Sequence, residues 1–180
     1  MRATISCGCA RPAFCSTPEE VSPLPSFRTQ RHVSFTPKQM FDVVADVERY
    51  PEFLPLCDSL IVTSRTETPE GTVLIATMGV GYKAIRESFT TRVVLDVSKL
   101  TIHVSYLDGP FSHLDNEWRF EAANGGATVH FFIDYAFGSP LLAIIVGAAF
   151  DKAVRSYTEA FEARARAVYG QPSSTAIPSS

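Results

Sequence analysis

The longest unbroken pattern in the chain lies near its C-terminal end, between Gly138-Ser139-Pro140 and Gly170-Gln171-Pro172. Serine at the N-cap and proline at the first helical position predict a helix over residues 140–169. At about 1.5 Å per residue this helix would be roughly 45 Å long. Every residue from Leu141 to Phe150 is apolar or glycine, and an amphipathic pattern begins at Asp151. A helix that is apolar on all sides needs apolar surroundings, so the first half requires more cover than an ordinary surface helix.

From residue 58 to residue 137 apolar and polar residues alternate, which is the period of a β-strand with one buried face. Glycine, proline and asparagine interrupt the alternation at regular intervals and predict about six antiparallel strands. These turn signals are Thr68-Pro69-Glu70-Gly71, Gly79-Val80-Gly81, Val97-Ser98-Lys99, Asp108-Gly109-Pro110 and Asn124-Gly125-Gly126.

The segment before these strands predicts one more strand and a short helix. Residues 27–35 alternate, and Thr36-Pro37-Lys38-Gln39 is a capping box with proline at the first helical position. The helix that follows has an apolar face that includes Met40 and Val44. In residues 50–56, two prolines bracket three large apolar residues. This segment is either a second short helix packed on the core or the lip of a pocket.

The order of elements predicts an α+β fold, because no helix follows each strand as a βαβ protein would require. We expect a curved antiparallel sheet with the long helix on its concave face. If the helix does not fill the concavity, an apolar cavity remains between the two. The expected ligand contacts are the inward positions of sheet and helix, namely Glu87, Phe89, Val93, Asn116, Trp118, Phe120, Phe131, Ile133, Tyr135, Leu142, Val146 and Phe150.

Two of these residues are polar side chains on otherwise apolar strand faces. Glu87 shares a face with Phe89, and Asn116 shares a face with Trp118. A buried polar group costs a few kcal/mol unless it is hydrogen-bonded. Glu87 and Asn116 therefore either satisfy the backbone or each other at a strand end, or are the few polar contacts for a ligand in an apolar cavity.

Composition and motifs exclude several functions. The net charge of −3 shows no basic excess, so we do not expect nucleic acid as a main partner. The four cysteines lack the paired spacing of a zinc site, and no nucleophile elbow, HExxH or Walker sequence is present. No uncharged run reaches the roughly 18 to 20 apolar residues that span a bilayer. With Glu87 as the one acid or base expected in the cavity, we expect neither catalysis nor a catalytic cofactor or metal.

The two ends of the chain differ from its body. Residues 1–27 read as a disordered leader or transit-like arm, with arginine, serine and cysteine but no acidic residue before Glu19. A short extension of a bacterial protein is the alternative. We expect one lipid-binding domain over residues 28–170 and a disordered tail over residues 171–180.

Several linked motifs give the chain a family resemblance. They are Val47-Glu48-Arg49-Tyr50-Pro51-Glu52-Phe53-Leu54-Pro55, Arg86-Glu87-Ser88-Phe89-Thr90-Thr91-Arg92-Val93, Leu107-Asp108-Gly109-Pro110-Phe111, Leu114-Asp115-Asn116-Glu117-Trp118-Arg119-Phe120 and Ala160-Phe161-Glu162-Ala163-Arg164-Ala165. In this order they closely resemble the coenzyme Q-binding START-domain proteins of the polyketide cyclase/dehydrase-like, helix-grip superfamily. The resemblance covers about residues 28–170. One departure is Leu56, where the family usually has tryptophan.

The resemblance implies a helix-grip fold whose hydrophobic tunnel binds ubiquinone, and a lipid chaperone that supports respiration and quinone biosynthesis. Expected partners are ubiquinone or its precursors, a membrane surface and proteins of quinone biosynthesis. The location would be the cytoplasmic face of a bacterial inner membrane or the matrix side of the mitochondrial inner membrane. We expect a membrane gate at the apolar residues Tyr50, Phe53, Leu54, Leu141, Ile144 and Ile145. Within the superfamily, the alternatives are a ribosome-association toxin and an aromatase/cyclase.

Overall fold

The structure is a computed structural model that describes residues 25–170. The first strand begins at Ser26, inside the range expected for the leader. The remainder of that leader and the tail expected over residues 171–180 lie outside the described residues.

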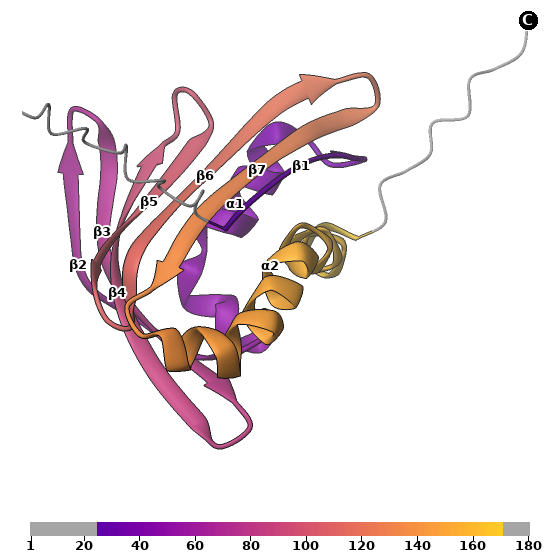
Figure 1. Ribbon diagram of the computed structural model, residues 1–180. Helices are drawn as coiled ribbons and strands as arrows, with labels where there is room; N and C mark the ends of the chain where they lie inside the picture. The colour runs from indigo at the N-terminus through magenta and orange to yellow at the C-terminus, as the bar shows by residue number, and fades with distance from the viewer. Residues whose placement is uncertain (1–24, 171–180) are drawn as a thin grey trace, which may run out of the picture.

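A single antiparallel sheet of seven strands forms the body of the molecule, in the order β1-β7-β6-β5-β4-β3-β2 (Figure 1). The strands are β1 (Ser26–Val33), β2 (Cys57–Thr68), β3 (Gly71–Tyr82), β4 (Ile85–Asp96), β5 (Thr101–Asp108), β6 (Phe111–Ala123) and β7 (Gly126–Phe137). Consecutive strands from β2 to β7 pair with each other, and β1 closes the far edge against β7. The six strands predicted after residue 57 are confirmed.

Three helical segments complete the fold: α1 (Pro37–Ala45), the 3-10 helix η1 (Val47–Glu52) and α2 (Pro140–Tyr169). The sheet curves, and α1 and α2 lie on its concave side (Figure 1). The predicted α+β arrangement, a curved antiparallel sheet around a long C-terminal helix, is confirmed. The bounds of α2 agree with the predicted residues 140–169, and the Ser139 hydroxyl accepts a hydrogen bond from the Leu142 amide at 3.5 Å.

The capping box predicted at residues 36–39 is present at the start of α1. The Gln39 amide donates to Thr36 Oγ1 at 3.2 Å, and the Thr36 amide donates to Gln39 Oε1 at 2.9 Å. Two of the amides that a helix start leaves without partners are thereby satisfied. The apolar face of α1 is buried in the core, where Phe41 packs edge to face on Phe120 of β6.

The core lies between the concave face of the sheet and the helices. Alternate residues of β7, from Val129 to Tyr135, are at most 5% exposed. The wet face of the same strand carries His130, Phe132 and Asp134, as the alternation predicts. A side-chain period of two thus identifies the buried face of the sheet.

One predicted turn is absent. Gly79-Val80-Gly81 lies inside β3, which continues to Tyr82, and the chain turns at residues 83–84 instead. The two glycines allow strand β2 to lie close to β3. A Cβ atom at Gly79 would lie 2.4 Å from Ser59 Oγ, and one at Gly81 would lie 2.1 Å from a carboxylate oxygen of Asp58. Glycine in a strand interior therefore marks crowding here, and not a turn.

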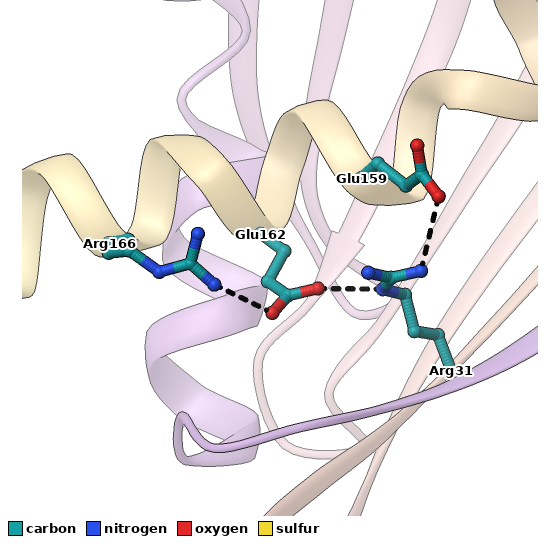
Figure 2. A network of polar contacts seen from close by, with 4 residues as sticks. All are labelled: Arg31, Glu159, Glu162 and Arg166. Atoms are coloured by element: carbon teal, nitrogen blue, oxygen red, sulfur yellow. Dashed lines mark hydrogen bonds and ion pairs between the residues drawn. The ribbon is translucent and has the colours of Figure 1, made fainter. Parts of the chain in front are cut away.

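The second half of α2 is tied to the sheet by ion pairs. Figure 2 shows Arg31 of β1 between two glutamates of the helix. Arg31 Nε donates to Glu162 Oε2 at 2.6 Å, and Arg31 Nη1 lies 3.4 Å from Glu159 Oε1. Glu162 also accepts a hydrogen bond from Arg166 at 3.0 Å. This network fixes the C-terminal half of the helix against the edge strand.

The first half of α2 has no charged side chain and rests on the fold through apolar contacts. Val146 and Phe150 are buried, whereas Leu141, Ile144 and Ile145 are 66%, 80% and 47% exposed. The all-apolar half is therefore covered on one side only. The extra cover expected from the sequence is not supplied by any residue that the structure describes.

Candidate functional site

An internal cavity lies between the concave face of the sheet, η1 and α2. The cavity has a volume of about 90 Å³. This is several times the roughly 10 to 15 Å³ that one water molecule requires. Its wall is built mainly of aliphatic and aromatic side chains. The lining residues are Val47, Tyr50, Leu54, Leu60, Ala76, Met78, Phe89, Thr91, Val93, Ile102, Val104, Leu114, Asn116, Trp118, Ile133, Phe150, Tyr157 and Phe161.

Asn116 is held by its neighbours. Its Nδ2 donates to the Phe132 carbonyl at 2.7 Å, and its Oδ1 accepts from Trp118 Nε1 at 2.9 Å. The first interpretation of Asn116, that it satisfies nearby backbone, is therefore correct, with Trp118 as a second partner. These two bonds set the position of the indole ring in the cavity wall.

Two other polar side chains of the wall also have partners inside the protein. The Tyr50 hydroxyl donates to the Val44 carbonyl at 2.5 Å, and Thr91 Oγ1 donates to the Ala76 carbonyl at 3.5 Å. Burial raises the pKa of Tyr50, with smaller contributions from Cys57 and Tyr157. The tyrosine thus stays protonated and keeps its hydrogen bond.

Tyr157 of α2 differs from these groups, because its hydroxyl makes no hydrogen bond to any residue in the range 25–170. Burial raises the pKa of Tyr157, and the neighbouring Cys57 thiol raises it further. Cys57 itself is buried and donates to the Ser59 carbonyl at a sulfur to oxygen distance of 3.6 Å. Burial, followed by the charge of Asp58, raises the pKa of Cys57 to about 11. Both groups are therefore neutral at physiological pH.

Two further hollows lie beside this cavity, and each shares lining residues with the one before it. Phe150 lines the cavity and also a small hollow of about 20 Å³ between β3, β4 and α2. That hollow shares Ile85, Glu87, Pro110 and Leu142 with an open groove of about 460 Å³ beside the start of α2. Phe150 therefore lies at the boundary between the cavity and the small hollow, which borders the groove beside the exposed start of α2.

The structure brings half of the expected ligand contacts together in the cavity wall. These residues are Phe89, Val93, Asn116, Trp118, Ile133 and Phe150. Leu142 and Val146 line the small hollow on the outer side of Phe150. The sheet and α2 both contribute apolar side chains to the cavity and to the hollow, as expected from the strand alternation and the apolar helix.

Three expected contacts lie in the packed core beside the cavity. Phe120 packs on Phe41 of α1, and Phe131 lies 4.4 Å from the Trp118 ring, centroid to centroid. Tyr135 packs edge to face on Phe150 with 4.8 Å between centroids. None of the three lines the cavity, although all share the buried face of the sheet with residues that do.

The expectation that Glu87 is buried is wrong. Glu87 is exposed, and burial along β4 begins at Phe89. Glu87 instead lines the small hollow and the groove, beside Leu142. It is a charged residue at the entrance and not a polar contact inside the cavity.

The six expected gate residues occupy two separate places. Tyr50 and Leu54 line the cavity, and Phe53 packs edge to face on Phe161 near the C-terminal half of α2. Leu141, Ile144 and Ile145 are exposed at the start of the same helix.

Other wall residues were not singled out from the sequence. They are Val47, Leu60, Ala76, Met78, Thr91, Ile102, Val104, Leu114, Tyr157 and Phe161. Their alternation or helical spacing shows that they face inward. No sequence signal separates an inward residue at a void from one in close packing.

Within residues 25–170, no three His, Cys, Asp or Glu side chains gather where they could hold a metal ion. In the same range, no helix is both long enough and apolar enough to cross a bilayer. The polar groups of the cavity wall are hydroxyl, amide and indole groups.

Residues 33–162 match the family described as polyketide cyclase / dehydrase and lipid transport. Among similar proteins, the ribosome association toxin RatA of Vibrio cholerae is 34% identical over 140 residues, covering 77% of this chain and 94% of the toxin. The mitochondrial coenzyme Q-binding protein COQ10 homolog B of Xenopus laevis is 31% identical over 147 residues. That match covers 77% of this chain and 57% of the frog protein.

Solved structures show the same fold. An 18 kDa protein of Caulobacter crescentus is 34% identical, with a TM-score of 0.68 over 82% of this chain and all of that protein. The Zhui aromatase/cyclase of Streptomyces has a TM-score of 0.69 at 17% identity, covering 81% of this chain and 96% of the enzyme, which is a likeness of fold alone. The predicted helix-grip fold is thus confirmed, and the chain belongs to the polyketide cyclase / dehydrase and lipid transport family.

Proposed function

We propose that the protein is a lipid chaperone that binds ubiquinone or a prenylated precursor of it, without catalysing a reaction. The observation that carries the proposal is the apolar cavity, which borders a small hollow at Phe150, and that hollow borders a groove at the exposed end of α2. The cavity takes the ring of the quinone. The tail passes Phe150 and follows the groove toward the surface.

The energetics fit a carrier. Burial of one five-carbon isoprene unit is favourable by roughly 3 to 4 kcal/mol, at about 0.8 kcal/mol for each methylene-sized group. A bilayer offers the tail nearly the same gain. An apolar site can therefore accept and release the tail with little net change in free energy, which is what reversible delivery requires.

The exposed start of α2 supports docking on a membrane. Leu141, Ile144 and Ile145 project from the helix beside the groove. Insertion of these side chains into the lipid interface would remove apolar surface from water. The protein would then be peripheral on a respiratory membrane, on the cytoplasmic face in a bacterium or the matrix side in a mitochondrion. Proteins of quinone biosynthesis would be its neighbours there.

The name of the frog relative, a coenzyme Q-binding protein, supports the quinone as ligand. A second candidate function is ribosome association. It is favoured by relatives named ribosome association toxin, such as the 35% identical protein of Pseudomonas aeruginosa. An aromatase or cyclase activity has less support, because no Asp, Glu, His, Lys or Arg is among the residues that line the cavity and the aromatase/cyclase likeness is one of fold.

The single tryptophan of the chain makes a direct test possible. Trp118 lines the cavity, so a quinone bound there should quench its fluorescence. We expect saturable quenching by a decyl-tailed ubiquinone analogue, with one binding site per chain. Linear quenching without saturation would contradict the proposal. Sedimentation of the protein with ribosomal subunits, together with unsaturable quenching, would support the second candidate function instead.

A further inference from the structure

The polar groups of the cavity wall differ in whether they have a hydrogen-bond partner inside the protein. Tyr50, Thr91, Asn116 and Trp118 use their hydrogen-bonding groups on partners inside the protein. Tyr157 has no such partner among the residues that the structure describes. Its hydroxyl is a donor that a ligand can use at no cost to an existing hydrogen bond.

The surroundings of Tyr157 keep this donor available. Burial and the neighbouring Cys57 thiol both raise the pKa of the hydroxyl, so the proton is retained at physiological pH. Tyr157 lies on the inward stripe of α2 with Phe150, Val154 and Phe161, at helical spacings of three or four residues. The side chain thus belongs to the helix face that covers the sheet.

Tyr157 and Phe150 mark two different ends of the cavity along α2. Phe150 marks the side toward the groove, and Tyr157 is seven residues further along the helix. At about 1.5 Å per residue, the two positions are separated by roughly 10 Å along the helix axis. The ion pairs of Arg31 hold the Tyr157 end of α2 in place, whereas the other end rests on apolar contacts alone. The Tyr157 donor therefore lies in the half of α2 that the Arg31 ion pairs hold.

We propose that Tyr157 is the residue that selects and orients the ligand, by donating a hydrogen bond to an oxygen acceptor on its ring. This inference rests on the proposed function. The ligand class is a ring with a carbonyl or alkoxy oxygen at one end and an apolar tail at the other. The ring oxygen lies at Tyr157, and the tail leaves past Phe150.

Tyr157→Phe tests the inference, because it removes one oxygen atom from the wall. Two probes with the same decyl tail on a six-membered ring are compared by Trp118 fluorescence or calorimetry: decylubiquinone, and decylbenzene, which has no oxygen. We expect quinone affinity to fall about 3-fold to 10-fold, as for the loss of one hydrogen bond, and decylbenzene affinity to stay within about 2-fold. Tyr106→Phe is the matched control, because Tyr106 lies outside the cavity wall.

A spectroscopic measurement separates a hydrogen bond from a general loosening of the cavity. In the wild-type complex, one carbonyl band of the bound quinone should lie at lower frequency than in the Tyr157→Phe complex. The inference is overturned if the band does not move, or if both probes lose affinity equally. Failure of both probes to bind the wild-type protein would instead overturn the proposed function.

Discussion

Filling the cavity should abolish lipid binding while preserving the fold, and Ala76→Leu is the substitution that the structure favours. Ala76 of β3 is 3% exposed and lines the cavity. Leucine adds three carbon atoms, each comparable with the roughly 30 Å³ that a water occupies in the liquid, or about 90 Å³ in all. The cavity volume of about 90 Å³ can therefore accept the new side chain.

The expected change in stability is small. Three additional buried carbons would stabilise the protein by about 2.4 kcal/mol if they fit without strain. Overpacking would cost about 1 to 3 kcal/mol. The two effects nearly cancel, so the free energy of unfolding of Ala76→Leu should lie within about 2 kcal/mol of the wild-type value.

The expected loss of affinity is much larger. A ligand that can no longer place one ring-sized or isoprene-sized group in the cavity loses roughly 3 kcal/mol of burial, or more than 100-fold in affinity. Quinone binding is measured by Trp118 fluorescence, and stability by urea denaturation. Ala122→Leu is the matched control, because Ala122 is exposed on β6. Wild-type quinone affinity in a stably folded Ala76→Leu protein would refute the placement of the ligand.

Three further predictions concern the membrane surface, the cavity wall and pH. Ile144→Asp combined with Ile145→Asp should weaken liposome binding at least tenfold in a flotation assay, because two exposed apolar side chains leave the lipid interface. Asn116→Ala should lower the free energy of unfolding by about 1 to 3 kcal/mol in urea denaturation, because it leaves the Trp118 indole without its acceptor. Stability should fall as pH rises from 9 to 11, since the pKa of Cys57 is raised to about 11 and the folded state holds its proton more tightly.

Each of these predictions has a control. Val168→Asp combined with Tyr169→Asp places the same two charges on exposed apolar residues at the other end of α2 and should leave liposome binding unchanged. Asn124→Ala, in an exposed turn, should leave stability nearly unchanged. Cys57→Val should flatten the alkaline loss of stability. Equal slopes between pH 9 and 11 with and without the thiol would contradict the pH prediction.

The sequence predicted the fold well because its strongest signals are local. Ser139 and Pro140 mark the start of α2, and the capping box at Thr36 marks the start of α1. Alternation identified the inward face of β4, β5, β6 and β7. The turn predicted at Gly79 and Gly81 was wrong, because glycine allows both a turn and a close approach of strands. Only the position of β2 decides between the two.

The site was harder to predict, because the side-chain period shows which face of a strand a residue is on. It does not show how deeply that residue is buried or whether it borders a cavity. Glu87 and Phe89 share a face of β4, yet only Phe89 lies under α2. Tyr135 and Ile133 share a face of β7, yet only Ile133 borders the void. The sequence places Tyr157 only on the apolar face of an amphipathic helix. Whether its hydroxyl has a hydrogen-bond partner depends on residues of other elements, which the sequence pattern does not identify.

The central claim is that this interior holds a prenylated quinone. The most direct measurement is organic extraction and mass spectrometry of the protein purified from a quinone-producing host, with the Ala76→Leu protein purified in parallel. We expect ubiquinone or a prenylated precursor in the wild-type extract, close to one molecule per chain, and little in the variant extract. Equal amounts in both extracts, or no quinone in the wild-type protein, would contradict the claim.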